Sequence, residues 1–194
     1  MSQCASRFTD DNDEAPSPMQ DVSNLFLSEI MELFKRGLEK KCNPKLIIQE
    51  LDSLRFGWNM FGPEVYLKII KAFILLLPLQ EGPADLFSGF EHLMKYLGPV
   101  VQKYFHPEPF LKVFEEICAE VPALKSNGGL LLHYFYDNDL LYAYNVIQWF
   151  RYLDDKSPAK TDSVANFIEF LELPVDSDDS EDRIYVYRLK TNEK

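Results

Sequence analysis

The side chains best able to do chemistry lie between Leu130 and Phe150, where the acidic tetrapeptide Tyr136-Asp137-Asn138-Asp139 separates two aromatic runs. His133 and Asp137 are one helical turn apart and could share a metal ion. A metal site needs three or four ligands, however, and no third ligand is evident nearby. We therefore predict a core or helix-surface histidine and no metal site.

Signatures of bond-making catalysis are missing from the sequence. It contains no GxGxxG, Walker, HExxH or GxSxG motif. Gly128-Gly129 lacks a lysine or serine at phosphate-loop spacing and is interpreted as a bend before an apolar helix. Cys118 follows Ile117 in an apolar stripe, which predicts a small buried residue. We expect neither an enzyme with a nucleophile–base pair nor a bound cofactor.

Composition limits the partner class. The chain has 194 residues, enough for one domain with a buried core, and a formal charge of −11 from 31 acids and 20 bases. This balance argues against direct nucleic-acid binding, which needs a basic face, and favours a basic partner.

Cysteine usage and hydropathy indicate the compartment. The three cysteines form an odd set without CxxC spacing, which fits a reducing environment. The N-terminus does not resemble a signal peptide, and the longest apolar run, "AFILLLPL", is too short for a bilayer. We predict a cytoplasmic protein that does not contact membranes.

The elements that must position these residues are helical. Apolar residues recur at spacings of three and four from Val22 onward, and Asn43-Pro44 is typical of a helix start. Proline- and glycine-marked links separate the helical patterns that follow. The predicted helices cover about 22–38, 44–58, 63–77, 84–105 (one kinked helix or two, divided at Gly98-Pro99), 107–120, 124–136, 140–153 and 164–173.

Short links force neighbouring helices to run antiparallel, which predicts an all-α fold: about eight helices in antiparallel pairs stacked as a HEAT-like α-array. Residues 1–21 are expected to form a disordered acidic leader, 22–175 the helical domain and 176–194 an acidic tail. The late segment "RIYVYRLK" alternates like a strand but has no partner strand, so it is assigned to the tail.

The tetrapeptide by itself is typical of a turn, in which Asp139 would cap a helix beginning at Leu140. A second aromatic–acidic unit lies downstream in "NFIEFLELPVDSDDSED", where Phe167 and Phe170 share a helical edge and carboxylates follow. Trp149, at the end of the first unit, is predicted to belong to the core.

These two units, in this order, resemble the aromatic/acidic boxes of a HEAT-type domain at the C-terminus of the epsilon subunit of translation initiation factor 2B, shared with initiation factor 5. "FLSEIMELFKRGLEKKC", "IIQELDSLRFGWNM" and "LLLPLQ" are similar to successive helices of the epsilon subunit. The resemblance covers residues 22–182. The large upstream domains of that subunit do not occur in this sequence, so we expect either a stand-alone relative or a piece of a longer chain.

The resemblance implies guanine-nucleotide exchange on translation initiation factor 2, the GTPase that carries initiator tRNA. The catalytic glutamate of the family aligns with Glu50, and its essential tryptophan aligns with Phe170. Phenylalanine keeps the ring but loses the indole N–H donor. The segment Tyr142-Ala143-Tyr144-Asn145 stands where relatives carry acids, so the first box has lost charge.

Further contacts follow from the same resemblance. The partners would be the gamma GTPase subunit and the lysine-rich beta subunit of initiation factor 2, with other initiation factor 2B subunits as additional partners. The expected contact residues are Asp52, Arg55, Tyr136, Asp137, Asp139, Phe167, Asp176, Asp178, Asp179, Glu181 and Asp182. The alternatives are a binding module that holds the same factor, or another lysine-rich partner, without promoting exchange, and a helical scaffold in which both boxes are coincidental.

Overall fold

The computed structural model describes residues 18–173, with side chains from Val22 onward, and these residues form eight α-helices without a strand. The helices are α1 (Pro18–Glu39), α2 (Pro44–Gly57), α3 (Pro63–Leu75), α4 (Pro83–Tyr104), α5 (Pro107–Glu120), α6 (Leu124–Asp137), α7 (Ala143–Tyr152) and α8 (Asp162–Glu172). The predicted acidic tail, with Asp176, Asp178, Asp179, Glu181 and Asp182, and most of the predicted leader lie outside the described residues.

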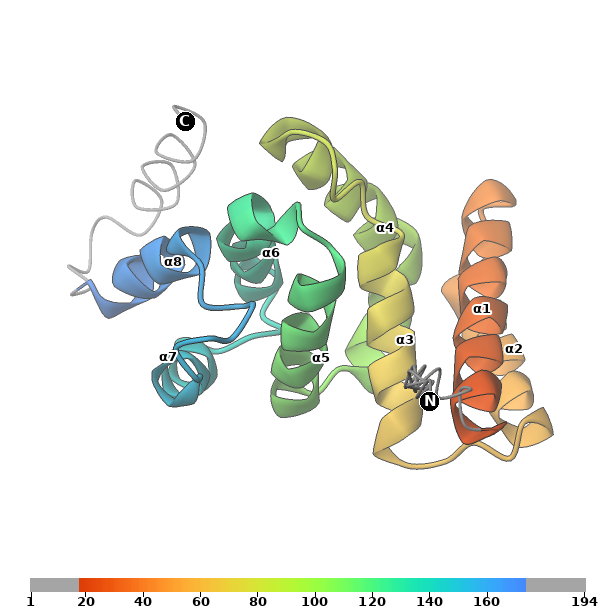
Figure 1. Ribbon diagram of the computed structural model, residues 1–194. Coiled ribbons are helices and arrows are strands. Elements are labelled where there is room, and N and C mark those ends of the chain that lie inside the picture. The colour runs from red at the N-terminus through yellow and green to blue at the C-terminus, as the bar shows by residue number, and fades with distance from the viewer. Residues whose placement is uncertain (1–17, 174–194) are drawn as a thin grey trace, which may run out of the picture.

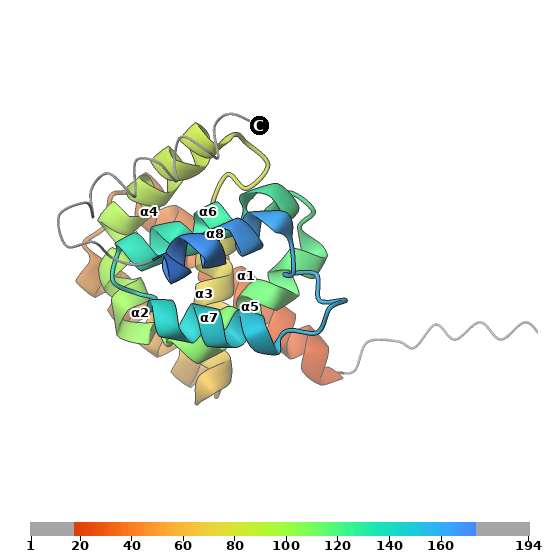
Figure 2. The ribbon, with the colours of Figure 1, turned by 90° about the vertical axis from the view of Figure 1, so that its left-hand side faces the viewer.

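Consecutive helices pack as pairs, and each pair stacks on the next. Contacts join α1 with α2, α3 with α4, α5 with α6 and α7 with α8, while α1 packs on α3, α3 on α5, α2 on α4 and α6 on α8. The stack runs from α1 and α2 at one end to α7 and α8 at the other (Figure 1), and Figure 2 looks along it from the α8 end. The prediction of an all-α array of antiparallel helix pairs is confirmed.

Local start signals place most helices where the sequence predicts them. The side chain of Asn43 accepts a hydrogen bond from the N–H of Lys45 at 2.9 Å, so it caps α2. Helices α3, α4 and α5 each begin with a proline, whose missing N–H is not needed in a first turn. Thr161 caps α8 by accepting from the N–H of Val164 at 3.3 Å. Helix α1 begins at Pro18, earlier than the expected start at Val22.

The segment that contains Gly98-Pro99 forms one helix, α4, with the proline inside it. Glycine before proline removes the Cβ that would clash with the proline ring. Val100 and Val101, beyond the proline, are fully buried. Their packing keeps the helix intact despite the hydrogen bond that the proline cannot donate.

Gly128-Gly129 does not form the predicted bend, because both glycines lie within α6. Helix α8 approaches α6 at this point. A Cβ on Gly129 would lie 1.9 Å from the carbonyl oxygen of Ser163, and the N–H of Gly129 donates to Ser163 Oγ at 3.0 Å. The glycines therefore permit close packing of two helices rather than a change of chain direction.

Asp139 does not cap the following helix, since α7 begins at Ala143 and not at Leu140. Asp139 instead ends α6 with a left-handed backbone, φ 57°. The N–H of Leu140 donates to the carbonyl of Phe135 at 3.0 Å, and the N–H of Asp139 donates to that of Tyr136, also at 3.0 Å. This is a Schellman turn, in which the left-handed position usually holds glycine.

The same turn ends two other helices in the described part of the chain. Lys41 (φ 49°) follows α1, and Asn59 (φ 52°) follows α2. The left-handed residue at Asn59 explains why α2 ends at Gly57, one residue before the predicted end at Trp58.

Helix α6 passes through the centre of the core, which explains its apolar sequence. The ring centroid of Phe135 lies within 6.0 Å of four other rings, those of Phe73, Phe90, Phe105 and Phe110. Phe135 is fully buried, whereas the next two residues are half-buried. The acidic tetrapeptide therefore begins where α6 leaves the core.

Two further residues of the core, His133 and Cys118, behave as predicted. His133 is fully buried in α6, and Cys118 is buried in α5. Burial raises the pKa of the Cys118 thiol to about 12, so it is not a thiolate at neutral pH. None of the eight described helices combines the length and the apolar run that a bilayer span requires.

Candidate protein-binding site

The aromatic residues of the two boxes meet where α8 packs on α6. The ring centroids of Tyr136 and Phe167 are 6.1 Å apart, and Phe167 stacks on Phe170 at 6.0 Å. The buried imidazole of His133 lies 5.5 Å from the ring of Phe170. The structure thus brings the first box and the helical part of the second box together, although they are separated by a whole helix in the sequence.

The members of this cluster differ in their access to a partner. Phe167 is fully buried, so it supports the neighbouring rings and cannot touch another protein. Tyr136 and Phe170 are half-buried, and Asp139 is exposed on the turn after α6. A carboxylate oxygen of Asp137 lies 3.4 Å from Nδ1 of His133, which ties the acidic segment to the cluster.

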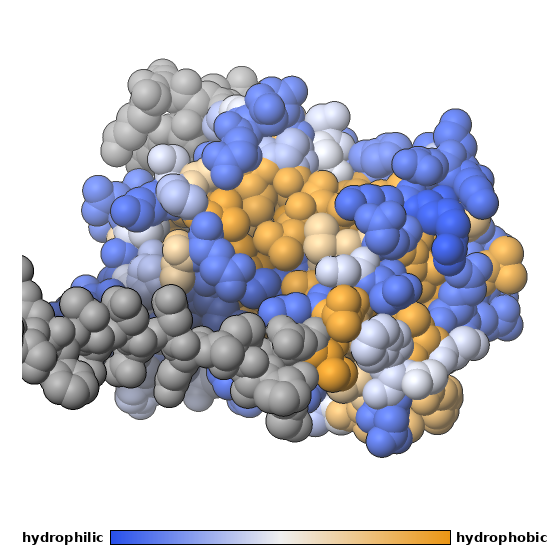
Figure 3. Space-filling model, turned by 45° about the vertical axis from the view of Figure 1, so that its right-hand side comes forward, coloured by the Kyte–Doolittle hydropathy of each residue, from blue (hydrophilic) through white to orange (hydrophobic). Residues whose placement is uncertain are grey.

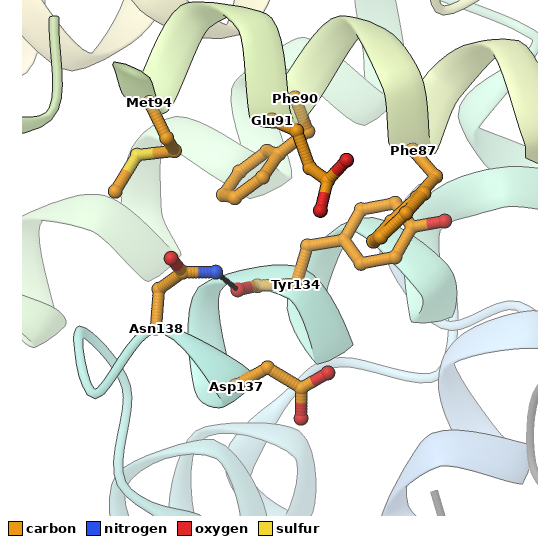
Figure 4. Close-up of a pocket in the computed structure, with 7 residues that line it drawn as sticks. All are labelled: Phe87, Phe90, Glu91, Met94, Tyr134, Asp137 and Asn138. Atoms are coloured by element: carbon orange, nitrogen blue, oxygen red, sulfur yellow. Dashed lines mark hydrogen bonds between the residues drawn. The ribbon is translucent and has the colours of Figure 1, made fainter. Parts of the chain in front are cut away.

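A groove of about 460 Å³ adjoins the cluster between α4 and α6. Its lining residues are Phe87, Phe90, Glu91 and Met94 of α4 and Tyr134, Asp137 and Asn138 at the end of α6 (Figure 4). The residues of the α4 wall were not predicted as site residues. Their spacing of three and four is the only sequence signal for a shared face, and a core stripe gives the same signal.

The outer face of α7 carries exposed rings beside this end of the stack. The exposed fractions of Tyr142, Tyr144 and Tyr152 are 62%, 72% and 85%, and Tyr142 directly precedes α7. Trp149 faces inward, edge-on to Phe114 with ring centroids 5.8 Å apart, and is half-buried. The tyrosines that replace acids in the first box are thus surface residues, whereas the tryptophan packs against the core.

Glu50 lies on α2, at the opposite end of the stack from α8 (Figures 1 and 2). Its side chain is exposed and forms an ion pair with Arg36 of α1. Such an exposed pair contributes about 0–1 kcal/mol, so a partner can displace the arginine at little cost. The structure does not bring Glu50 near the aromatic cluster.

Asp52 and Arg55 are half-buried and form contacts within the molecule. Asp52 accepts hydrogen bonds from Lys103 Nζ at 2.9 Å and from the Tyr104 hydroxyl at 2.8 Å, and it lies 3.2 Å from Arg55 Nε. Partial burial acts to raise the pKa of Asp52, but the hydrogen bonds and nearby cations outweigh it and hold that pKa below its ordinary value. These hydrogen bonds of Asp52 join α2 to α4.

Apolar side chains are exposed near the α2 end. The rings of Phe56 and Phe61 meet edge-on at 5.5 Å, and the guanidinium of Arg55 lies 5.2 Å from the Phe56 ring centroid. Figure 3, in which the side that carries α1 and α2 comes forward, shows hydrophobic side chains gathered in the middle of that face and hydrophilic ones around them. None of these exposed apolar residues was predicted as a site residue.

Among the described residues, no three histidine, cysteine, aspartate or glutamate side chains come together as metal ligands. Near the end of α6 the structure brings together rings, carboxylates and a groove. No protein-family model matches the sequence.

Proposed function

We propose that this chain is a guanine-nucleotide exchange factor-type domain that binds translation initiation factor 2. The observation that carries the proposal is the packing of the first box against the helical part of the second where α8 meets α6, with the ring centroids of Tyr136 and Phe167 6.1 Å apart. A two-part binding site requires its two segments to lie side by side, and the packing of α8 on α6 meets this requirement.

Charge supports a basic partner. The chain carries a formal charge of −11, and Asp137 and Asp139 lie at the aromatic cluster. The lysine-rich beta subunit of initiation factor 2 is complementary to such a surface. Long-range attraction of this kind mainly accelerates encounter, and salt weakens it.

The separation of Glu50 from the aromatic cluster suits a partner assembled from several subunits. The α6–α8 end would hold the basic segment, while Glu50 at the α2 end would reach the GTPase subunit. Exchange requires tighter binding to the nucleotide-free GTPase than to its GDP form. A tenfold to hundredfold weakening of GDP needs about 1.4–3 kcal/mol of such preference.

A second candidate function is binding to the same factor without exchange. Two observations favour it: Phe170 supplies no hydrogen-bond donor, and Tyr142-Ala143-Tyr144-Asn145 stands where the family that the chain resembles carries acids. The surface at α6 and α8 would be the same in either case, and only the consequence for GDP would differ.

Release of labelled GDP from purified initiation factor 2 tests both candidates. We expect the wild-type chain to accelerate release, Glu50→Gln to abolish the acceleration, and the matched control Glu116→Gln on α5 to retain it. Binding without acceleration would establish the second candidate. If the chain fails to bind initiation factor 2 even at low salt, both candidates are wrong.

A further inference from the structure

We propose that Ser157, in the connection between α7 and α8, is a phosphorylation site for a proline-directed protein kinase, and that its phosphate releases this connection from α5. This inference is independent of the proposed function. The connection covers residues 153–161 and is the blue loop that joins α7 to α8 in Figure 2. It leads directly into α8, the helix that packs on α6.

The residues that follow Ser157 match the chemistry that such a kinase selects. Pro158 comes next, and Lys160 stands three positions on. Proline has no N–H, so a kinase that selects it supplies no acceptor there, and any other residue leaves an enclosed N–H unpaired. A basic side chain at the third position is complementary to an anionic patch beside the kinase active site. The other Ser-Pro pair in the sequence, Ser17-Pro18, has Gln20 at that position.

In the folded chain the hydroxyl of Ser157 ties the connection to α5. It donates a hydrogen bond to Oε1 of Glu115 at 2.6 Å and accepts one from the N–H of Ala159 at 3.3 Å. Glu115 is half-buried, so water screens a charge placed beside it less than it would at an exposed position. A carboxylate only accepts hydrogen bonds, so this contact depends on the proton that Ser157 carries.

A kinase can reach Ser157 through local opening of the connection. Residues 154–156, directly before it, are exposed, and Pro158 is half-buried. Ala159 is fully buried but contributes only a methyl group to the core. Segments that bury so little apolar surface open without unfolding of the whole domain. The helices can therefore stay packed while the serine extends into a kinase active site.

Phosphorylation turns the attraction between Ser157 and Glu115 into repulsion. The bond from the γ-phosphorus of ATP to the β–γ bridging oxygen breaks and a bond from phosphorus to Oγ forms, while ADP leaves and the hydroxyl proton passes to a carboxylate base of the kinase. The product has no proton on Oγ and carries a charge of about −1.5 to −2 at neutral pH. It would face the Glu115 carboxylate, so the connection leaves α5 and the start of α8 loosens.

Treatment of the full chain with a purified cyclin-dependent kinase and ATP with Mg²⁺ tests the site itself. The substitution Ser17→Ala removes the other Ser-Pro pair, and mass spectrometry of digests locates the phosphate. We expect phosphate on Ser157, and we expect Pro158→Ala to slow its incorporation about tenfold or more. If Ser157 stays unmodified in the folded chain, or is modified equally fast in Pro158→Ala, it is not a proline-directed site.

Hydrogen exchange of the phosphorylated chain tests the consequence. The N–H groups of Ala159 and Lys160, which donate to Ser157, should exchange about tenfold faster or more, because the lost hydrogen bond and the repulsion act in the same direction. Glu115→Gln should remove most of this acceleration, since glutamine accepts from the unmodified hydroxyl and can donate to a phosphate. Glu116→Gln makes the same change in net charge and should retain it.

Each part of the inference has an outcome that would overturn it. Unchanged exchange after phosphorylation of Ser157 would show that the connection is not released. Equal acceleration in Glu115→Gln and Glu116→Gln would show that Glu115 is not the cause. Circular dichroism would confirm that the variants and the phosphorylated chain retain the wild-type helix content. No initiation factor is present in these measurements, so their result is separate from that of the GDP-release assay.

Discussion

Replacing Gly129 by alanine should separate α8 from α6 and thereby disturb the surface that joins the two boxes. The added Cβ would lie 1.9 Å from the carbonyl oxygen of Ser163, far inside a normal contact. A backbone carbonyl cannot rotate aside as a side chain does, so the start of α8 has to move.

Two opposed effects set the size of the change. Alanine in place of glycine favours an internal helical position by about 1 kcal/mol. Overpacking costs about 1–3 kcal/mol or more, and loss of the 3.0 Å hydrogen bond from the Gly129 N–H to Ser163 Oγ removes about 1 kcal/mol. Because the clash is with backbone, the upper part of that range applies, and the net loss in the free energy of unfolding should be about 2–3 kcal/mol.

Urea unfolding followed by far-ultraviolet circular dichroism measures this loss. For a chain of this size, about 2 kcal/mol also lowers Tm by roughly 4–8 °C. Gly57→Ala is the matched control, since Gly57 also lies in a helix but has nothing within 4 Å of an added Cβ. It should leave stability unchanged or raise it by up to about 1 kcal/mol. Equal or greater stability of Gly129→Ala than of Gly57→Ala would refute the close-approach argument.

Three further predictions concern stability and reactivity. Asp52→Asn should lower the free energy of unfolding by about 1–2 kcal/mol at pH 7, because it weakens the links between α2 and α4. Folding lowers the pKa of the Asp52 carboxyl, so its contribution to stability is present above the ordinary value of 3.8 and is lost as pH falls further. The stability difference between wild type and variant, measured from unfolding curves, should therefore shrink below about pH 4. A difference that grows below about pH 4 would contradict this prediction. Lys41→Gly should raise the free energy of unfolding by about 1 kcal/mol, because Lys41 has a left-handed backbone with φ 49°. The control Lys40→Gly, one residue before the left-handed position, should lower it by about 0.5 kcal/mol. Equal effects of the two substitutions in thermal melts would count against strain at Lys41. Cys118 is buried and its pKa is raised to about 12, so it should react with iodoacetamide only on unfolding. Half-buried Cys42 should react in the folded chain. Mass spectrometry of digests measures the order of labelling, and labelling of Cys118 before Cys42 would contradict the prediction.

The number, order and approximate bounds of the helices could be predicted because their signals are local. Asn43-Pro44, the prolines that open α3 to α5 and the spacing of apolar residues act within a few residues of the chain. The sequence did not decide whether Pro99 divides this segment into two helices or lies inside one. Its effect depends on whether packing of the following turn outweighs the missing hydrogen bond, and that packing comes from other helices.

The candidate site could be predicted only in part. The aromatic and acidic residue types of the boxes were visible, but the depth of each side chain was not: Phe167 is fully buried, whereas Phe170 is half-buried. The inward or outward position of a ring depends on the helix that packs over it. The α4 wall of the groove, with Glu91, was missed for the same reason.

The sequence by itself determined an all-helical chain with an acidic surface and two aromatic–acidic segments, since propensity, caps and charge belong to neighbouring residues. The tertiary structure decided which side chains meet. It placed Gly129 against Ser163, engaged Asp52 with Lys103, and set Glu50 at the far end of the stack from the aromatic cluster. These relations join residues distant in sequence, and they exist only after the helices have packed and excluded water between them.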